Sequence, residues 1–167
     1  YDVINDLSAT PLNGATSTGE GMVFDGNNDG VQISGMTIGG SAFVFEAYYK
    51  FNSLPNYRTN IFQTRKIDNA GASTQLIFLI KETNNDRYLY KTYNTSPHHA
   101  NRDTGASSVT FSTTHFKHVV MVQDGNNILI YDDGNLVDQV SCPHPTVFTP
   151  DIFVLGASTS FNDGMEG

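Results

Sequence analysis

Residues 42–51 read AFVFEAYYKF, and apolar or aromatic side chains recur at every second position. Successive side chains of a β-strand point to opposite faces of the sheet, so this pattern predicts a long strand. One predicted face is aromatic and fully buried, and the other is mixed. The buried face would carry Phe43, Phe45, Ala47, Tyr49 and Phe51, and the other Ala42, Val44, Glu46, Tyr48 and Lys50.

Outward from this stretch, further short apolar runs predict more strands. In residues 116–123 both faces are largely apolar, which is typical of a strand in the middle of a sandwich. His118 alternates there with Phe116 and Val120, and we interpret it as a hydrogen-bonded histidine of the core. The remaining predicted strands are residues 74–81, 87–93, 127–131 and 151–155.

Turn sequences rich in Asp, Asn and Gly separate these strands. Such residues tolerate the positive φ of tight hairpin turns, so each of these sites predicts a hairpin. No stretch shows the 3.6-residue period of an amphipathic helix. Short strands at this spacing predict an all-β sandwich or barrel. The four turn sequences are residues 25–30, 84–86, 124–127 and 132–135.

Size and charge narrow the classes of protein that the chain can represent. Its 167 residues fit a single domain, residues 1–167, and its single cysteine, Cys142, cannot form an internal disulfide. Nine basic residues against seventeen acidic ones give a net charge of −8. This balance disfavours nucleic acid and anionic membrane surfaces as partners. No apolar run is long enough for membrane insertion.

Four segments in order carry a resemblance to a known family. They are GMVFDGNNDGVQIS (21–34), SAFVFEAYYKF (41–51), FKHVVMVQDGNNILIYDDGNLV (116–137) and IFVLGAS (152–158). Together they resemble the laminin G-like and pentraxin-like domains of the concanavalin A-like lectin/glucanase superfamily. The resemblance implies an antiparallel two-sheet sandwich, a jelly roll, with little or no helix.

The chain departs from this pattern in two places. Phe116 stands where the family often has Trp. Family members also continue beyond a Gly-x-x-Gly like that of residues 164–167 into a closing strand. We therefore expect the chain to be a fragment of a larger protein, or a neighbouring chain to supply that strand.

The resemblance implies a non-catalytic extracellular module that binds glycan or protein ligands within a larger secreted or surface protein. A structural module of a surface fibre, appendage or virion, with neighbouring subunits as its partners, is the alternative. A glycan-active enzyme is the weaker alternative. Hydrolases of this fold use two nearby carboxyls, and no glutamate here has a same-face acidic neighbour on its strand.

Aromatic and basic residues in or near the polar connections are the candidate ligand-binding residues. Glycan binding needs aromatic faces for stacking and polar groups for hydroxyls. The long polar connections are expected at residues 52–58, 66–73 and 94–105, where loops on a rigid scaffold often carry function. The candidates are Tyr57, Arg58, Tyr88, Tyr90, Tyr93 and Arg102.

The stretch DGNNDG (25–30) has the oxygen-rich spacing of a calcium loop. An EF-hand is excluded, because the twelfth position is Met36 instead of Glu. A plain hairpin turn is one interpretation. The other is one structural Ca²⁺ held by Asp25, Asn27 and Asp29, as in many laminin G-like domains.

Asn94-Thr95-Ser96 is an N-glycosylation sequon, and its use would mark the secretory route.

Overall fold

The structure is a computed structural model that describes residues 7–25, 29–53, 59–67, 73–81, 88–94, 98–103, 109–141 and 147–156. These residues form strands and connections, with no helix among them. They accordingly contain no helix able to cross a membrane. The strands are β1 (Ser8–Leu12), β2 (Thr16–Thr18), β3 (Gly21–Val23), β4 (Gly30–Ser34), β5 (Ala42–Tyr49), β6 (Thr59–Ile67), β7 (Ser73–Lys81), β8 (Tyr88–Asn94), β9 (His98–Asp103), β10 (Lys117–Asp124), β11 (Asn127–Asp132), β12 (Asn135–Ser141) and β13 (Ile152–Leu155).

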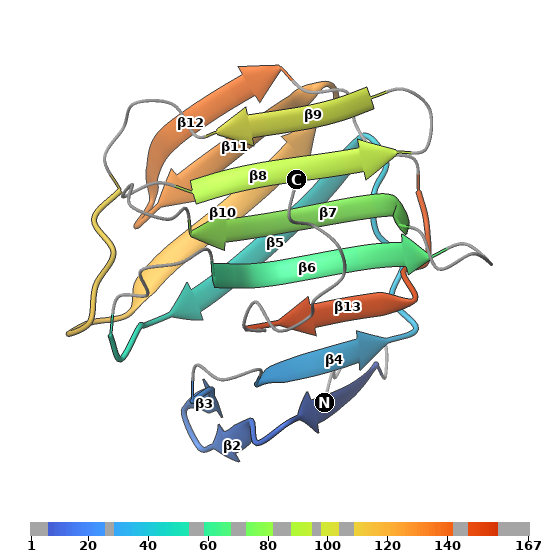
Figure 1. Cartoon of the computed structure of the whole chain (residues 1–167). Coiled ribbons are helices and arrows are strands. Elements are labelled where there is room, and N and C mark those ends of the chain that lie inside the picture. Colours follow the sequence, from blue (N-terminus) through green and yellow to red (C-terminus); the bar gives the residue numbers. More distant parts are fainter. Residues whose placement is uncertain are drawn as a thin grey trace.

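Two antiparallel sheets face each other across the core (Figure 1). The larger sheet has seven strands in the order β1-β4-β13-β6-β7-β8-β9, and the smaller has four in the order β12-β11-β10-β5. A short β2–β3 hairpin lies beside the larger sheet at its β1 end (Figure 1). The predicted all-β, two-sheet sandwich is confirmed.

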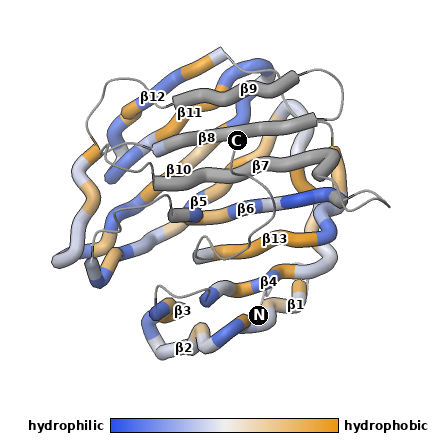
Figure 2. Tube along the Cα trace, viewed as in Figure 1, coloured by the Kyte–Doolittle hydropathy of each residue, from blue (hydrophilic) through white to orange (hydrophobic). Residues whose placement is uncertain are grey.

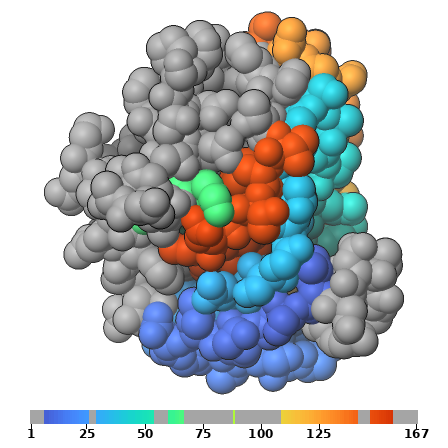
Figure 3. All heavy atoms as spheres, turned by 90° about the vertical axis from the view of Figure 1, so that its right-hand side faces the viewer, coloured from blue at the N-terminus to red at the C-terminus, as the bar shows by residue number. Residues whose placement is uncertain are grey.

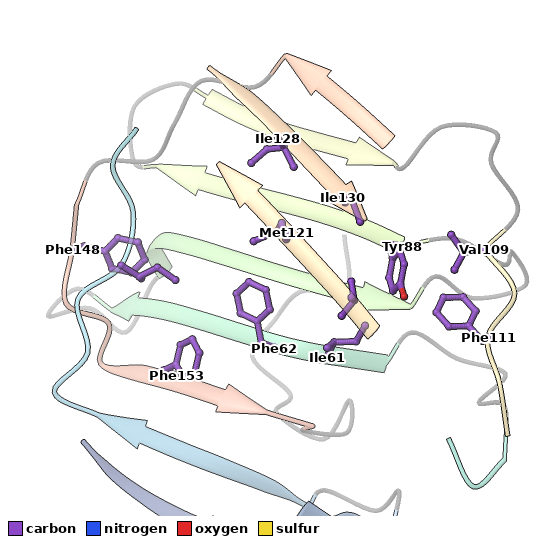
Figure 4. Packing of buried hydrophobic residues seen from close by; sticks show 12 residues of the cluster. Ile61, Phe62, Tyr88, Val109, Phe111, Met121, Ile128, Ile130, Phe148 and Phe153 are labelled. Carbon is purple, nitrogen blue, oxygen red and sulfur yellow. The ribbon is translucent and has the colours of Figure 1, made fainter. Parts of the chain in front are cut away.

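The core lies between the two sheets and combines aromatic and aliphatic side chains (Figure 4). Phe62 of β6 is fully buried, and its ring stacks on Phe45 of β5 with centroids 4.1 Å apart. This contact joins the two layers directly. Met121, Ile128 and Ile130 cover the core from the smaller sheet. Figure 2 shows β13 apolar along its length, whereas polar and apolar residues are mixed along β11 and β12.

The alternation predicted for residues 42–51 is confirmed, but the facing predicted for residues 116–123 is wrong. Phe43, Phe45, Ala47, Tyr49 and Phe51 all pack against the core, although each is partly buried and not fully buried as predicted. In β10, however, Lys117, Val119, Met121 and Gln123 are buried, and His118 is on the outer face. The register pairs Lys117 with the inward-facing Tyr49, which sets the facing of every later residue of β10. Both faces were apolar enough that the sequence pattern did not distinguish them.

Two predicted connections are also wrong. The predicted hairpin across residues 25–30 does not exist as such, because β3 pairs with β2 while β4 pairs with β1 and β13. The polar stretch 94–105 contains the edge strand β9 (His98–Asp103), which pairs with β8. An edge strand of polar composition lacks the apolar alternation that would have identified it. The hairpins predicted at residues 124–127 and 132–135 are confirmed.

Two of the segments that carried the family resemblance meet in space. A Cβ built at Gly156, just after β13, would lie 2.6 Å from the ring of Phe24, just after β3. Gly156 also has φ of +67°, a conformation that favours glycine. At the other end of β13, the stretch before the strand lies against the segment leading into β5 (Figure 3), where Ile38 and Phe148 exchange two backbone hydrogen bonds of 2.9 Å. The glycine therefore allows the Phe24 ring to lie directly on the backbone.

We expect Gly156→Ala to lower the free energy of unfolding by about 2–4 kcal/mol, measured by urea denaturation. The new methyl group adds a clash with Phe24 to the cost of the positive φ. Gly125→Ala is the matched control, because Gly125 has φ of +58° with nothing within 4 Å of its Cβ position. Equal losses in both variants would contradict the proposed close packing at Gly156.

Candidate functional site

An exposed cluster on the outer face of the smaller sheet, here called the aromatic patch, is the strongest candidate for a binding site. Tyr48 of β5 is 68% exposed, and its ring stacks on that of His118 of β10, with centroids 4.3 Å apart and planes 9° from parallel. The two residues are register partners on adjacent strands. The imidazole of His118 therefore covers and supports one face of the Tyr48 ring. The patch comprises Glu46, Tyr48, Lys50, Phe116 and His118.

Polar groups of the patch hold its rings in place. Nε2 of His118 lies 2.8 Å from Oε1 of Glu46, which fixes the imidazole beneath Tyr48. Nζ of Lys50 lies 5.6 Å from the ring centroid of Phe116, which is 53% exposed. The sequence pattern placed Glu46 on the mixed face of its strand. In the structure its carboxylate is a hydrogen-bond acceptor beside the stacked rings of Tyr48 and His118. The patch combines flat apolar surface with hydrogen-bonding groups.

A polar network lies on the inner side of the same strand ends. The hydroxyl of Tyr88 donates to Oδ1 of Asp132 at 2.8 Å and lies 2.7 Å from the hydroxyl of Tyr49. Nζ of Lys117 lies 2.7 Å from Oδ2 of Asp132 and also contacts Asp133. Tyr88, Asp132 and Lys117 are all buried. Because β8 belongs to the larger sheet, the network joins the two sheets by polar contacts.

The charges of this network are stabilised by one another. Burial disfavours the ammonium of Lys117, but the carboxylates of Asp132 and Asp133 outweigh it and raise the pKa of Lys117. Conversely, hydrogen bonds from Lys117 and from the backbone N–H of His118 lower the pKa of Asp133. Burial raises the pKa of both Tyr49 and Tyr88, so their hydroxyls stay protonated.

Asp133 connects the buried network to the aromatic patch. Its Oδ1 accepts from the backbone N–H of His118 at 2.9 Å, while its own N–H donates to the carbonyl of His118 at 2.8 Å. Asp133 adopts φ of +49° in the β11–β12 turn, which places its carboxylate over β10. The backbone that carries His118 is therefore fixed on both sides.

Of the six predicted ligand-binding residues, Tyr88 is the one whose side chain the structure describes. The prediction that Tyr88 presents a ring for stacking is wrong, because the residue is fully buried and bonded to Tyr49 and Asp132. The register pairs Tyr90 with Arg102 and Tyr93 with His99 in β8 and β9, although their side chains lie outside the described set. Tyr57 and Arg58 lie outside the described residues, and Asn94 is the last residue of β8.

The proposed calcium loop contains a buried carboxylate. Asp29 is 2% exposed, and its Oδ2 accepts from the backbone N–H of Asp25 at 2.8 Å. Its Oδ1 is buried with no hydrogen-bond partner among the described residues, and lies 3.0 Å from the Cβ position of Gly14. Asn27 falls outside the described residues, and those described contain no group of three or more His, Cys, Asp or Glu residues placed to hold a metal ion. Carboxylate oxygens are the ligands that Ca²⁺ prefers, so this oxygen is a candidate ligand.

The sequence-based search missed the aromatic patch because it looked in the polar loops. Tyr48 stands in the predicted strand 42–51, on the face opposite the aromatic one. A large aromatic residue on the solvent side of a strand was the available signal, but it could be interpreted only once the facing of β10 was known.

Comparisons with known proteins agree on the fold. The family model described as the concanavalin A-like lectin/glucanases superfamily matches residues 25–167. The solved structure of the carbohydrate binding module CBM66 from Bacillus subtilis is similar to this chain, with a TM-score of 0.56 and 15% sequence identity. The match covers 90% of this chain and 92% of that one. No curated protein matches the chain in sequence.

We expect Lys117→Met to lower the free energy of unfolding by roughly 3 kcal/mol in urea denaturation at pH 7, because it leaves the Asp132 carboxylate buried without its cation. Lys66→Met is the matched control, since Lys66 pairs with Asp151 where both side chains are 41% exposed. That variant should lose less than about 1 kcal/mol. Similar losses in the two variants would show that the buried network is no more important than a surface ion pair.

Proposed function

The chain belongs to the concanavalin A-like lectin/glucanase superfamily, and we propose that it is a carbohydrate-binding module whose ligand stacks on the exposed ring of Tyr48. The observation that carries the proposal is the 68% exposure of a tyrosine held flat against His118. The structural similarity to a carbohydrate binding module supports it.

The chemistry of the patch suits a sugar ring. The C–H face of a pyranose or furanose is apolar and packs on an aromatic ring, while its hydroxyls need acceptors and donors at the rim. Glu46 supplies an acceptor close to the stacked rings, and Lys50 supplies a donor near Phe116. Supporting Tyr48 in advance lowers the entropy cost of ordering it on binding.

We propose that this binding is non-catalytic. Glycoside hydrolysis by the usual mechanisms uses two carboxyl groups about 5–9 Å apart. The aromatic patch as defined contains one carboxylate, that of Glu46, and its Oε1 is already bonded to His118.

We further propose that the module works outside the cell or on a cell or virion surface, as one part of a longer secreted or surface protein. Polysaccharides exposed there would be its ligands. A structural role in a surface assembly is a second candidate function, favoured by apolar side chains exposed on the same sheet, notably Val44 at 63% and Leu136 at 49%. Exposed apolar side chains on a sheet face are typical of contact surfaces.

We also propose that Asp29 holds a structural Ca²⁺, with Asp25 and Asn27 as further oxygen donors. The buried Oδ1 of Asp29 without a partner among the described residues supports this. The ion would supply the missing counter-charge at the connection between the β2–β3 hairpin and β4. Use of the sequon at Asn94 remains a prediction.

Tyr48→Ala should weaken binding to the preferred polysaccharide by about tenfold or more, because it removes the stacking face. The preferred ligand would first be identified by affinity electrophoresis against neutral and acidic polysaccharides. Tyr48→Phe should retain most of the affinity, since the ring remains.

Val44→Ala is the control for loss of exposed apolar surface, because Val44 lies on the same face of β5 and is 63% exposed. It should bind like the wild-type chain. Unchanged binding by folded Tyr48→Ala would refute the assignment of the site to Tyr48. Absence of binding to every polysaccharide by the folded wild-type chain would favour the assembly role.

Added Ca²⁺ should raise the melting temperature of the chelator-treated chain. A ligand present at 100 times its Kd stabilises a protein by about 2.7 kcal/mol. Asp29→Asn should abolish the shift, whereas Asp124→Asn, at the exposed last residue of β10, should keep it. A wild-type chain whose melting temperature is insensitive to Ca²⁺ contains no such site.

A further inference from the structure

The larger and the smaller sheet of the sandwich have four edge strands between them. These strands differ in how well they are protected from pairing with another strand. Edge strands present unpaired backbone N–H and C=O groups, and proteins protect them with proline, charges, bulges or short length. In the larger sheet, β1 contains Pro11, and β9 has the polar and charged sequence HHANRD. In the smaller sheet, β12 contains Asp138, and its ladder with β11 is interrupted by a bulge. Each of these three edge strands therefore has at least one feature that discourages pairing with another strand.

The fourth edge strand, β5, has almost none. It runs for eight residues, Ala42–Tyr49, without proline, glycine, lysine or arginine. Its ladder with β10 is regular from one end to the other, and within the described part of the chain β10 is its one sheet neighbour. Its single charge, Glu46, accepts a hydrogen bond from His118.

The packing of β5 is also incomplete in the described structure. Phe43, Phe45, Ala47 and Tyr49 face the core, yet each is only partly buried, whereas their neighbours Val119 and Met121 on β10 are fully buried. On the outer face, Val44 is 63% exposed. A strand added beside β5 would cover the aromatic side chains of the inner face and satisfy the backbone groups of the edge.

From these observations we infer that the edge of β5, which no described strand covers, is a docking site for an extended segment of a partner protein, which adds a fifth strand to the smaller sheet. Strand addition of this kind takes its affinity from main-chain hydrogen bonds and its specificity from alternate side chains. The inward residues of the segment would be apolar, to cover Phe43 and Phe45. The residue opposite Glu46 would be basic, because opposite charges in a cross-strand pair are favourable.

A second copy of this chain fits the edge less well than such a segment. Two β5 strands paired antiparallel about a two-fold axis keep outward residues opposite outward residues. Any register with near-complete overlap then places the two Glu46 side chains opposite or diagonally adjacent, and like charges so placed are destabilising. Each chain also carries a net charge of −8, which adds repulsion between copies. A segment with apolar inward residues and a basic residue opposite Glu46 avoids both the contact between two glutamates and the repulsion between two acidic chains.

The experiment uses the full chain and a labelled synthetic octapeptide of alternating valine and threonine, with lysine at one central threonine position. Fluorescence anisotropy measures binding, and hydrogen exchange measures protection of the β5 amides. We expect the peptide to bind and to slow exchange within residues 42–49. Val44→Lys should weaken binding about tenfold, because it places a like charge beside the peptide lysine, while Val44→Thr, a neutral replacement of the same size, should bind as the wild type does.

Two peptide controls and one variant test the mechanism. A peptide whose alternate amides are N-methylated along the pairing edge should lose binding, as should one with glutamate in place of lysine. Tyr48→Ala should still bind the peptide, so failure of the carbohydrate proposal and failure of this one are distinguishable.

Three results would overturn the inference. Equal binding of the N-methylated peptide would exclude strand addition, and absent protection of residues 42–49 would exclude β5 as the site. A wild-type dimer in analytical ultracentrifugation that Val44→Lys converts to monomers would assign the edge to a second copy.

Discussion

The ion pair between Lys117 and Asp132 is the constraint on which the smaller sheet depends. A lysine ammonium is rarely buried without a partner, because desolvation of the charge is expensive. Here Asp132 and Asp133 compensate it, and the hydroxyl of Tyr88 brings the larger sheet into the same network. Since Lys117 must face inward to meet these groups, His118 must face outward. The position of the imidazole that supports Tyr48 follows from the burial of its neighbour.

This dependence explains which parts of the structure could be predicted from sequence. The period-2 pattern of residues 42–51 has an aromatic face and a mixed one, so its facing is unambiguous, and the described packing confirms it. In residues 116–123 the facing is decided by Lys117, which a hydrophobicity pattern assigns to solvent. Its carboxylate partner Asp132 belongs to a different strand, and Tyr88 to the other sheet. The local sequence contains no sign of such partners.

The candidate site was missed for a related reason. Long polar loops on β scaffolds often carry function, so the search favoured residues such as Tyr88 and Tyr93 near them. The polar stretch 94–105 proved to contain an edge strand, and Tyr88 proved to belong to the interior. By contrast, the aromatic patch combines residues of β5 and β10 that are far apart in sequence and adjacent only through the register. The calcium site at Asp25, Asn27 and Asp29 stays a prediction; it rested on the spacing of oxygen donors along one loop, which is a local property, and the structure shows that the carboxylate of Asp29 is buried.

The contact between Phe24 and Gly156 has a consequence for the order in which the chain can fold. Strand β4 lies between β1 and β13, so a segment synthesised early has its neighbour on one side among residues synthesised late. Pairings between such distant segments have a large loop-closure entropy and form slowly. During synthesis on the ribosome, the β1–β4 segment must therefore wait for most of the chain to emerge before it can join the larger sheet. Until then the β2–β3 hairpin and the ring of Phe24 lack these neighbours, and exposed apolar side chains and unpaired strands of this kind favour aggregation.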